Sequence, residues 1–190
     1  IELISCKIFA VMDSDDIALP TRFEKQLPLL ISGEADVVGG WIEEFDCTPG
    51  DLSKVREVPA KYQDILNFCK WRNPINHVTL IFNKEAYDKV GGYCSIRYNE
   101  DWDLIVRMLL KGVIVRNIPE VFVNVRAGNS MIARRRAFPQ FKRDISLFFS
   151  MYRSGFINIL ILCTNIILRG FLRILPISIT VFVYKYFLRR

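Results

Sequence analysis

Three acidic residues near the start of the chain have the types and spacing of a metal-binding loop. Asp13, Asp15 and Asp16 follow residues 7–12, an apolar run with the β-branched and aromatic content of a buried strand. In open α/β sheets, ligands bind at the loops that follow the carboxyl ends of strands. Clustered carboxylates need a cation, and Mg²⁺ or Mn²⁺ accepts such oxygen ligands together with water and phosphate oxygens. The triplet therefore points to a bound nucleotide diphosphate, with a metal-free polar turn or helix cap as the alternative.

A second acidic cluster lies at the start of a predicted helix over residues 100–111. It comprises Glu100, Asp101 and Asp103, and Gly112 ends the helix. One of these carboxylates could remove a proton as a general base. The helix dipole lowers the pKa of a carboxylate at this end, whereas neighbouring acids raise it, so the pattern leaves the protonation open. Capping of the helix is the alternative role.

Candidate anion-binding residues are the single histidine and a run of arginines. His77 stands at the start of a predicted strand, where it could donate a hydrogen bond to a phosphate or sugar hydroxyl, or serve a structural role. Arg134 and Arg135 begin a run of three arginines that could clamp a pyrophosphate. Residues 1–150 contain as many acidic as basic side chains and no nucleic-acid-binding motif, so we expect no nucleic-acid partner.

Alternating strand and helix patterns must position these side chains. Strands are predicted at residues 7–12, 35–41, 77–82 and 113–125, helices at 21–32, 62–71, 84–90 and 100–111, and a polar loop at 43–59. Strands that alternate with helices predict an α/β sandwich around a mostly parallel sheet.

Length, composition and charge divide the chain in two. Its 190 residues, 51% of them hydrophobic, suffice for one domain and exclude a disordered protein. The net charge of +6 arises from residues 151–190, which hold six basic side chains and no acidic one. We therefore expect a neutral globular domain over 1–150 and a basic apolar tail over 151–190. Five cysteines without a CxxC pair argue against a zinc site or disulfide scaffold and indicate the reducing, cytoplasmic side.

The tail has the composition of helices that lie in a membrane interface. Its longest uncharged runs, 154–168 and 174–184, are shorter than the roughly 20 apolar residues of a spanning helix. Basic residues separate and follow them, so apolar faces would enter the acyl boundary while the cations meet lipid phosphates. A tail packed on its own domain or on a partner, and a true membrane span, are the alternatives.

Five segments together resemble a known enzyme family. They are residues 9–17 (FAVMDSDDI), 73–79 (NPINHVT), 89–93 (KVGGY), 99–104 (NEDWDL) and the arginine-rich 126–136. In order and spacing they resemble the family 2 inverting glycosyltransferases, in particular bacterial enzymes that build capsule, O-antigen or exopolysaccharide. The likeness covers roughly residues 4–190, because the tail also resembles the membrane-associated tail of those enzymes.

The resemblance implies a GT-A fold, which is Rossmann-like, a Mn²⁺ or Mg²⁺ ion, and a nucleotide-sugar donor, with a UDP-sugar expected. Asp13 and Asp15 match the family's DxD motif, whose acids hold the metal, and Asp13 and Asp16 would face the donor. Three further residues are expected at the donor: His77, Arg134 and Arg135.

The resemblance also implies how the acceptor is used. Asp101 matches the aspartate of the family's Glu-Asp motif, which removes the proton from the acceptor hydroxyl, and Glu100 and Trp102 would flank the acceptor. The transfer would invert the anomeric configuration, and the acceptor would be a glycan or a lipid-linked sugar. The enzyme would act as a peripheral protein at the cytoplasmic face of the inner membrane.

One part of the family pattern has no counterpart here, namely the strands that precede the DxD strand and carry the acid that reads uracil and ribose. The chain begins with Ile1 rather than Met, so we expect the C-terminal part of a GT-A domain, with an open sheet edge and no activity by itself, followed by apolar basic membrane-associated helices. Two other functions stay open: a non-catalytic, truncated membrane-associated scaffold, and a glycosidase with paired carboxylates and no metal.

Overall fold

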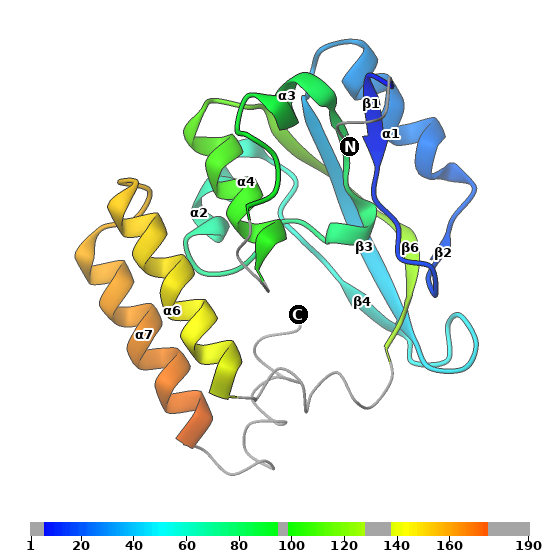
Figure 1. Ribbon diagram of the computed structural model, residues 1–190. Coiled ribbons are helices and arrows are strands. Elements are labelled where there is room, and N and C mark those ends of the chain that lie inside the picture. Colours follow the sequence, from blue (N-terminus) through cyan, green and yellow to red (C-terminus); the bar gives the residue numbers. More distant parts are fainter. Residues whose placement is uncertain (1–5, 95–98, 128–137, 175–190) are drawn as a thin grey trace. The chain divides into compact units, whose positions relative to one another are not determined.

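The computed structural model describes residues 6–94, 99–127 and 138–174 (Figure 1). The chain divides into two compact units, one of Ile1–Ser95 with Glu100–Ala127 and the other of Ile96–Asn99 with Gly128–Arg190. The division follows Ala127, earlier than the boundary near residue 150 that the charge distribution suggests. The reason is that the helix beginning at Phe138 packs on the helix that follows it.

A six-stranded sheet forms the centre of the first unit. Its strands are β1 (Ile8–Ala10), β2 (Ile17–Ala18), β3 (Val37–Phe45), β4 (Lys54–Arg56), β5 (Ile81–Asn83) and β6 (Val115–Arg126). They lie in the order β1-β5-β3-β6-β2, with β4 paired to β3. β3 and β6 run parallel, whereas every other pair among the described strands is antiparallel. The prediction of a mostly parallel sheet is therefore wrong, and the sheet is mixed.

Whether two strands run parallel or antiparallel depends on which strands pair. A hydrophobic pattern along the sequence does not identify those pairs. β3 turns into β4 through a short hairpin, and such a connection joins only antiparallel strands. The loop predicted at 43–59 is thus partly strand, since Glu44 pairs with Lys54. Residues 77–79, predicted as strand, instead form the 3-10 helix η1 (His77–Thr79) ahead of β5.

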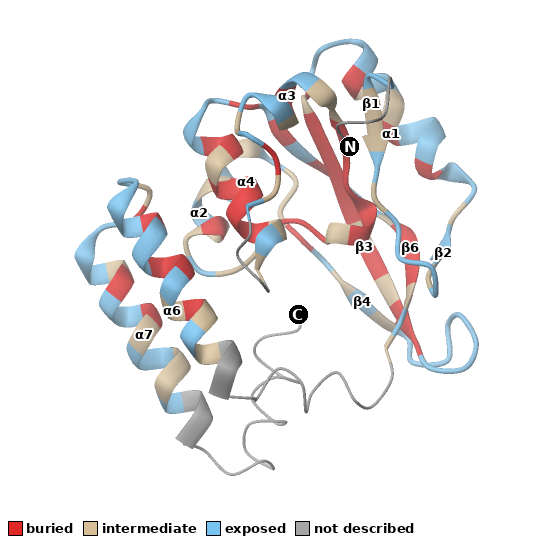
Figure 2. Cartoon of the chain, viewed as in Figure 1, coloured by how far each residue is buried: buried red, intermediate tan, exposed pale blue. Residues whose placement is uncertain are grey.

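Helices lie on both faces of the sheet (Figure 1). They are α1 (Thr21–Ile31), α2 (Tyr62–Cys69), α3 (Lys84–Asp88) and α4 (Glu100–Leu110), close to the predicted ranges. α1 contacts β3, β5 and β6, whereas α2 contacts β6 and α4. Buried residues follow β3 and α4 in Figure 2. One core cluster, made of Leu30, Ala35, Val38 and Ile81, joins α1 to the sheet.

Two glycines let β3 and β6 approach closely. A β-carbon at Gly39 would overlap the side chain of Asn117, and one at Gly40 would overlap the ring of Phe122. The register between the two strands shifts on both sides of Trp41, next to Gly40. This irregularity realigns the strands so that their last residues face each other at the carboxyl end of the pair.

The second unit contains a helical hairpin of α6 (Phe138–Arg153) and α7 (Ile159–Ile174), which pack on each other. Asp144 of α6 is buried, and its Oδ2 lies 3.2 Å from Nη1 of Arg169 on α7. The Arg169 guanidinium also lies 4.8 Å from the ring centre of Phe148. These contacts favour one alignment of the two helices. Within the described ranges, the length and apolar content of every helix fall short of what a membrane crossing requires.

Candidate active site

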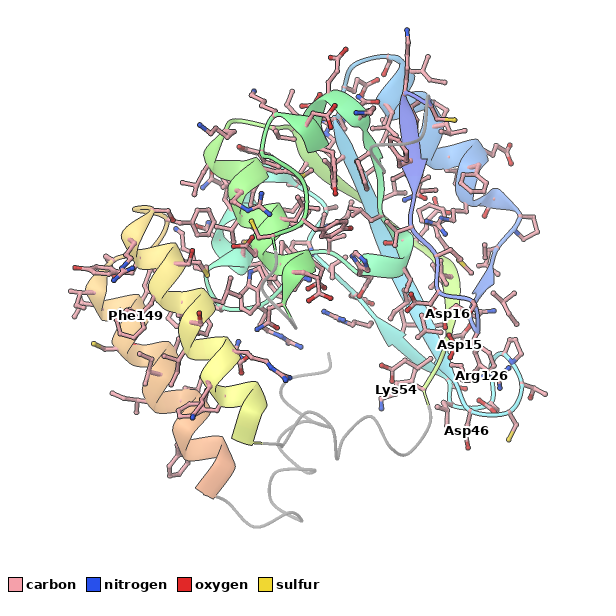
Figure 3. All side chains as sticks on the ribbon, viewed as in Figure 1. Asp15, Asp16, Asp46, Lys54, Arg126 and Phe149 are labelled. Carbon is pink, nitrogen blue, oxygen red and sulfur yellow. The ribbon has the colours of Figure 1, made fainter. Side chains whose placement is uncertain are left out.

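The acidic loop, residues 13–16, joins β1 to β2 near the end of the sheet where β3 and β6 finish (Figure 3). Asp13 and Asp15 are exposed, whereas Asp16 is half-buried. Oδ1 of Asp16 accepts the backbone N–H of Arg126 at 3.0 Å. Its Oδ2 is buried and has no hydrogen-bond partner among the described residues, so it keeps free capacity for a ligand.

The electrostatics of the acidic loop suit a cation. Burial raises the pKa of the Asp16 carboxyl above its usual value, and the Asp13 and Asp15 carboxylates raise it further, against the lowering effect of the Arg126 backbone N–H and charge. The described ranges contain no group of three or more His, Cys, Asp and Glu side chains that could enclose a metal ion. The donor set fits instead an ion that takes one or two carboxylates and completes its shell with water and ligand oxygens.

Arg126, the last residue of β6, holds its guanidinium in a defined place beside the acidic loop (Figure 3). Its Cζ lies 4.7 Å from the ring centre of Phe45, the buried last residue of β3. Its Nη1 donates to the carbonyl oxygen of Asp46 at 3.1 Å, and the side chain stays exposed. A guanidinium has five N–H donors, so those not used by Asp46 can bind an anion.

The hairpin between β3 and β4 borders the same end of the sheet. Asp51 closes it by accepting the backbone N–H groups of residues 46–48 at 2.7 to 3.3 Å. These bonds, that of Thr48 above all, lower the pKa of the Asp51 carboxyl. Lys54 begins β4, and its Nζ lies 3.4 Å from Oε2 of the buried Glu44. Lys54 is thereby paired with the last-but-one residue of β3, at the end of the strand that carries Phe45.

Two hydrogen bonds hold the Asp101 carboxylate in a fixed orientation. It lies in the first turn of α4 and is half-buried. Nδ2 of Asn73 donates to its Oδ2 at 2.7 Å, and the backbone N–H of Trp102 donates to its Oδ1 at 2.8 Å. Asn73 is itself held, because its Oδ1 accepts the backbone N–H of Ile75 at 3.2 Å. The carboxylate is thus oriented from both sides while part of it remains open to solvent.

The other residues of the second acidic cluster have different surroundings. Asp103 is buried and accepts from Nε of Arg107 at 2.7 Å, which makes it structural. Glu100 is exposed beside Asp101. Trp102 is only 5% exposed, and its indole N–H donates to the carbonyl oxygen of Cys69 at 3.0 Å. The expected contact of Trp102 with the acceptor is corrected accordingly, since its side chain lies in the core and positions the first turn of α4.

His77 lies in η1 beside Tyr93, for which the sequence analysis predicted no role in the site. Its ring meets the ring of Tyr93 edge to face, with centres 6.0 Å apart. The His77 Nδ1 and the Tyr93 hydroxyl are both buried without hydrogen-bond partners among the described residues. Burial, followed by the charges of Tyr87, Asp101 and Glu100, raises the pKa of Tyr93 far above its usual value. His77, Tyr93 and Asp101 therefore belong to one polar neighbourhood.

Arg126 and Asn73 lie in segments that carry the family resemblance, but their roles were not predicted, and Lys54 had no signal in the sequence. Arg126 and Lys54 gain their positions from strand pairing, and Asn73 is 28 residues away from Asp101 along the chain. The only sequence signal for Tyr93 was its place at the end of the KVGGY segment, residues 89–93. Arg134 and Arg135, expected at the donor, lie outside the described residues.

The sequence matches a family profile and several named bacterial proteins. Residues 1–91 match the family described as Glycosyl transferase family 2. An uncharacterized glycosyltransferase of Haemophilus influenzae is 37% identical over 94% of this chain and 67% of its own length. The amylovoran biosynthesis glycosyltransferase AmsE of Erwinia amylovora is 31% identical over 97% of this chain and 69% of its own. An Escherichia coli UDP-Gal:alpha-D-GlcNAc-diphosphoundecaprenol beta-1,3-galactosyltransferase is 34% identical over 94% of this chain and 65% of its own length.

The fold has a counterpart among solved structures. The crystal structure of Staphylococcus aureus TarS 1-349 in complex with UDP-GlcNAc superposes with a TM-score of 0.57 at 12% identity, covering 90% of this chain and 50% of that one. This likeness supports the expected GT-A fold. The chain spans about two thirds of the length of the three named relatives. At these identities and coverages, the chain belongs to glycosyl transferase family 2.

Proposed function

We propose that the chain carries the reaction centre of a glycosyltransferase that moves a sugar from a UDP-sugar to a glycan or lipid-linked sugar, with inversion, in bacterial surface polysaccharide synthesis. Two relatives are named for amylovoran biosynthesis and for transfer to a diphosphoundecaprenol-linked sugar, which supports this substrate class. The observation that carries the proposal is the acidic loop seated against Arg126 at the carboxyl ends of β3 and β6. It combines carboxylates for a cation with a fixed cationic group for an anionic leaving group.

On the donor side, Asp13 and Asp15 are the proposed ligands of Mn²⁺ or Mg²⁺. When bound, the ion would supply positive charge to the departing diphosphate. Asp16, held by the Arg126 backbone, offers its free Oδ2 to a donor hydroxyl. The Arg126 guanidinium donates to phosphate oxygens, where negative charge grows as the bond to the anomeric carbon breaks. The exposed part of His77 would complete this site at the donor.

On the acceptor side, Asp101 is the proposed general base. A sugar hydroxyl is a poor nucleophile, so its proton must leave as the new bond forms. Asp101 takes that proton on a carboxylate oxygen, while Asn73 keeps the carboxylate in the required orientation. Attack in line with, and opposite to, the leaving diphosphate inverts the anomeric carbon. Glu100, exposed next to Asp101, would contact the acceptor.

A transfer assay tests this function against its two alternatives. The full-length protein is incubated with a panel of UDP-sugars, Mn²⁺ and a polyprenyl-diphosphate-linked sugar, and the product's anomeric configuration is read by NMR; the 190 residues alone, tested in parallel, should be inactive. Transfer with inversion is the expected result. Donor binding without transfer would favour the non-catalytic scaffold, and sugar release that persists in EDTA would favour a glycosidase.

Replacing Arg126 with Ala should weaken donor binding about 10- to 100-fold, because a hydrogen bond to a charged group is worth about 1.5–3 kcal/mol. Arg126→Lys should give an intermediate loss, since it keeps the charge without the planar fork. The measurement is calorimetric titration with UDP in the presence of Mn²⁺. Arg116→Ala is the matched control, an exposed arginine of the same strand that pairs with Glu34. Equal affinities for both alanine variants would contradict the proposed contact.

We also propose that the protein works as a peripheral protein at the cytoplasmic face of the membrane, through α7. Leu160, Ile167 and Phe171 are 73%, 70% and 58% exposed and recur on one face of this helix. Phe149 of α6 is exposed as well (Figure 3). Asp144 is the one acidic residue in the sequence from 138 to 174, against five basic ones. An apolar face in a basic hairpin suits anionic lipid.

The double variant Leu160→Gln and Ile167→Gln should bind anionic vesicles at least about 10-fold more weakly, because burial of each such side chain contributes about 1.5–3 kcal/mol. Sedimentation with vesicles of anionic and zwitterionic lipid measures the effect. Thr21→Gln, at an exposed polar site of α1 in the first unit, serves as the control. Undiminished binding by the double variant would rule out this face as the membrane contact.

A further inference from the structure

A buried guanidinium lies behind the start of the acidic loop. Arg22 of α1 is 1% exposed, and burial lowers its pKa below the usual value. Its Nη2 donates to the carbonyl oxygens of Val11 at 2.8 Å and Leu80 at 3.5 Å, and its Nη1 lies 3.3 Å from the sulfur of Met12. In the part of the chain that the structure describes, no carboxylate forms an ion pair with it.

Gln26, one turn further along α1, braces this guanidinium. Its Oε1 accepts from Nε of Arg22 at 3.3 Å. Its Nε2 donates to the carbonyl oxygens of Thr79 at 3.0 Å and Val38 at 3.4 Å, which ties it to η1 and β3. Gln26 is fully buried. The pair therefore connects the end of β1 to the centre of the sheet through side chains alone.

The stability of the fold does not explain why a cationic side chain occupies the position of Arg22. An ionised group that is buried without a charged partner is costly, and an apolar residue of similar size would avoid that cost. What the guanidinium supplies is geometry: its Nη2 donates to two carbonyl groups at once, while Gln26 holds its Nε and fixes the plane of the group. Val11 also donates its own N–H to the Leu80 carbonyl oxygen at 2.9 Å, so both polar groups of Val11 are fixed. Because both groups are fixed, the direction in which the backbone continues from Val11 to Asp13 is fixed as well.

We propose that Arg22, braced by Gln26, is a positioning residue for the acidic loop. It fixes the carbonyl group of Val11, two residues before the loop, so that Asp13 and Asp15 present their carboxylates to a common cation. The inference rests on the proposed function for its metal, whereas the ordering of the loop by Arg22 stands independently of it.

Two readouts on the purified protein test the proposal without any catalytic assay. The first is amide hydrogen exchange over residues 11–17, where the Val11 N–H bonds to Leu80 and the Asp16 N–H bonds to the Asp13 carbonyl oxygen. The second is Mn²⁺ affinity, measured by electron paramagnetic resonance with the metal alone. Arg22→Met removes the donors and the charge at similar length, and Arg22→Lys keeps the charge but not the fork.

Arg22→Met should speed exchange over residues 11–17 at least about 10-fold and weaken Mn²⁺ binding about 10- to 100-fold, as loss of residues that orient metal ligands does. Arg22→Lys should recover part of both. Leu30→Ala is the matched control, since it opens the α1 core away from the loop and should lower the melting temperature without changing either readout. If Arg22→Met does not fold, Gln26→Leu removes the brace and its bonds to Val38 and Thr79 but keeps the guanidinium, and it should speed exchange and weaken Mn²⁺ binding as well.

Unchanged exchange over residues 11–17 in a folded variant, or equal changes in the Leu30→Ala control, would overturn the proposal. Faster exchange in a protein whose wild type binds no Mn²⁺ would support the positioning role and count against the metal part of the proposed function. The two failures are therefore distinguishable.

Discussion

Asp101→Asn should lower kcat for sugar transfer by about 10²- to 10⁴-fold, the range in which a positioned general base contributes. The amide cannot accept the hydroxyl proton, yet it matches the carboxylate in size, and its one oxygen can still accept from the Nδ2 of Asn73, while the Trp102 N–H loses its side-chain acceptor. The fold of α4 should survive, because its packing runs through Trp102 and the Asp103–Arg107 ion pair. Affinity for UDP with Mn²⁺ should be unchanged. The measurement is steady-state transfer at saturating acceptor, paired with donor titration.

Asp64→Asn provides the matched control, since Asp64 is an exposed aspartate in the first turn of α2 and lies outside the proposed machinery. It should transfer at the wild-type rate. Asn73→Ala should lower kcat less than Asp101→Asn, because it frees the carboxylate without removing it. A wild-type rate for Asp101→Asn would refute the assignment of the base.

Asp15→Asn should reduce transfer by about 10²- to 10³-fold, the loss expected when one element of electrostatic stabilisation of a developing anion is removed. The Asp15 carboxylate is exposed and makes no side-chain hydrogen bond to the residues that the structure describes, so the melting temperature should stay within a few degrees. The Mn²⁺ affinity should fall with the rate. Adding Asp13→Asn to Asp15→Asn should reduce the transfer rate much less than Asp13→Asn reduces it in the wild type. The reason is that two ligands of one ion act as a unit.

Treatment with EDTA gives the decisive comparison for Asp15→Asn. Wild-type transfer should fall to about the level of the variant, and the variant's residual rate should hardly respond. Glu34→Gln, which alters an exposed pair with Arg116 in the same unit, is the control and should respond to EDTA as the wild type does. Full activity of wild type in EDTA would show that Asp15 acts without a metal.

Local sequence pattern located most of the helices and the polar loop after β1 correctly. The predicted helices at 21–32 and 100–111 correspond to α1 and α4, whose apolar residues recur at helical spacing. The acidic loop was placed after β1 because a β-branched and aromatic run ends there in polar residues. Such signals depend on residues that are neighbours in the chain. They can therefore be recognised in the sequence before the fold is known.

The environment of each acid could not be predicted in the same way. Asp101, Trp102 and Asp103 are consecutive, yet one is oriented by Asn73, one fills the core against α2, and one pairs with Arg107. A helix turns 100° per residue, so adjacent side chains meet different partners. Which partner each one meets is decided by the packing of α4, and the sequence pattern contains no record of it.

The sequence by itself determined the family, the two acidic clusters and the alternation of strands and helices, because motif spacing and hydrophobic period are properties of neighbouring residues. Only the tertiary structure decided that β3 and β6 run parallel while their neighbours do not, and that Arg126 ends beside Asp16. The position of Arg126 beside Asp16 depends on the register between β3 and β6. That register shifts next to Gly40, where the two strands approach closely. Register is set by contacts between residues far apart in the chain, so it emerges only when the sheet is assembled.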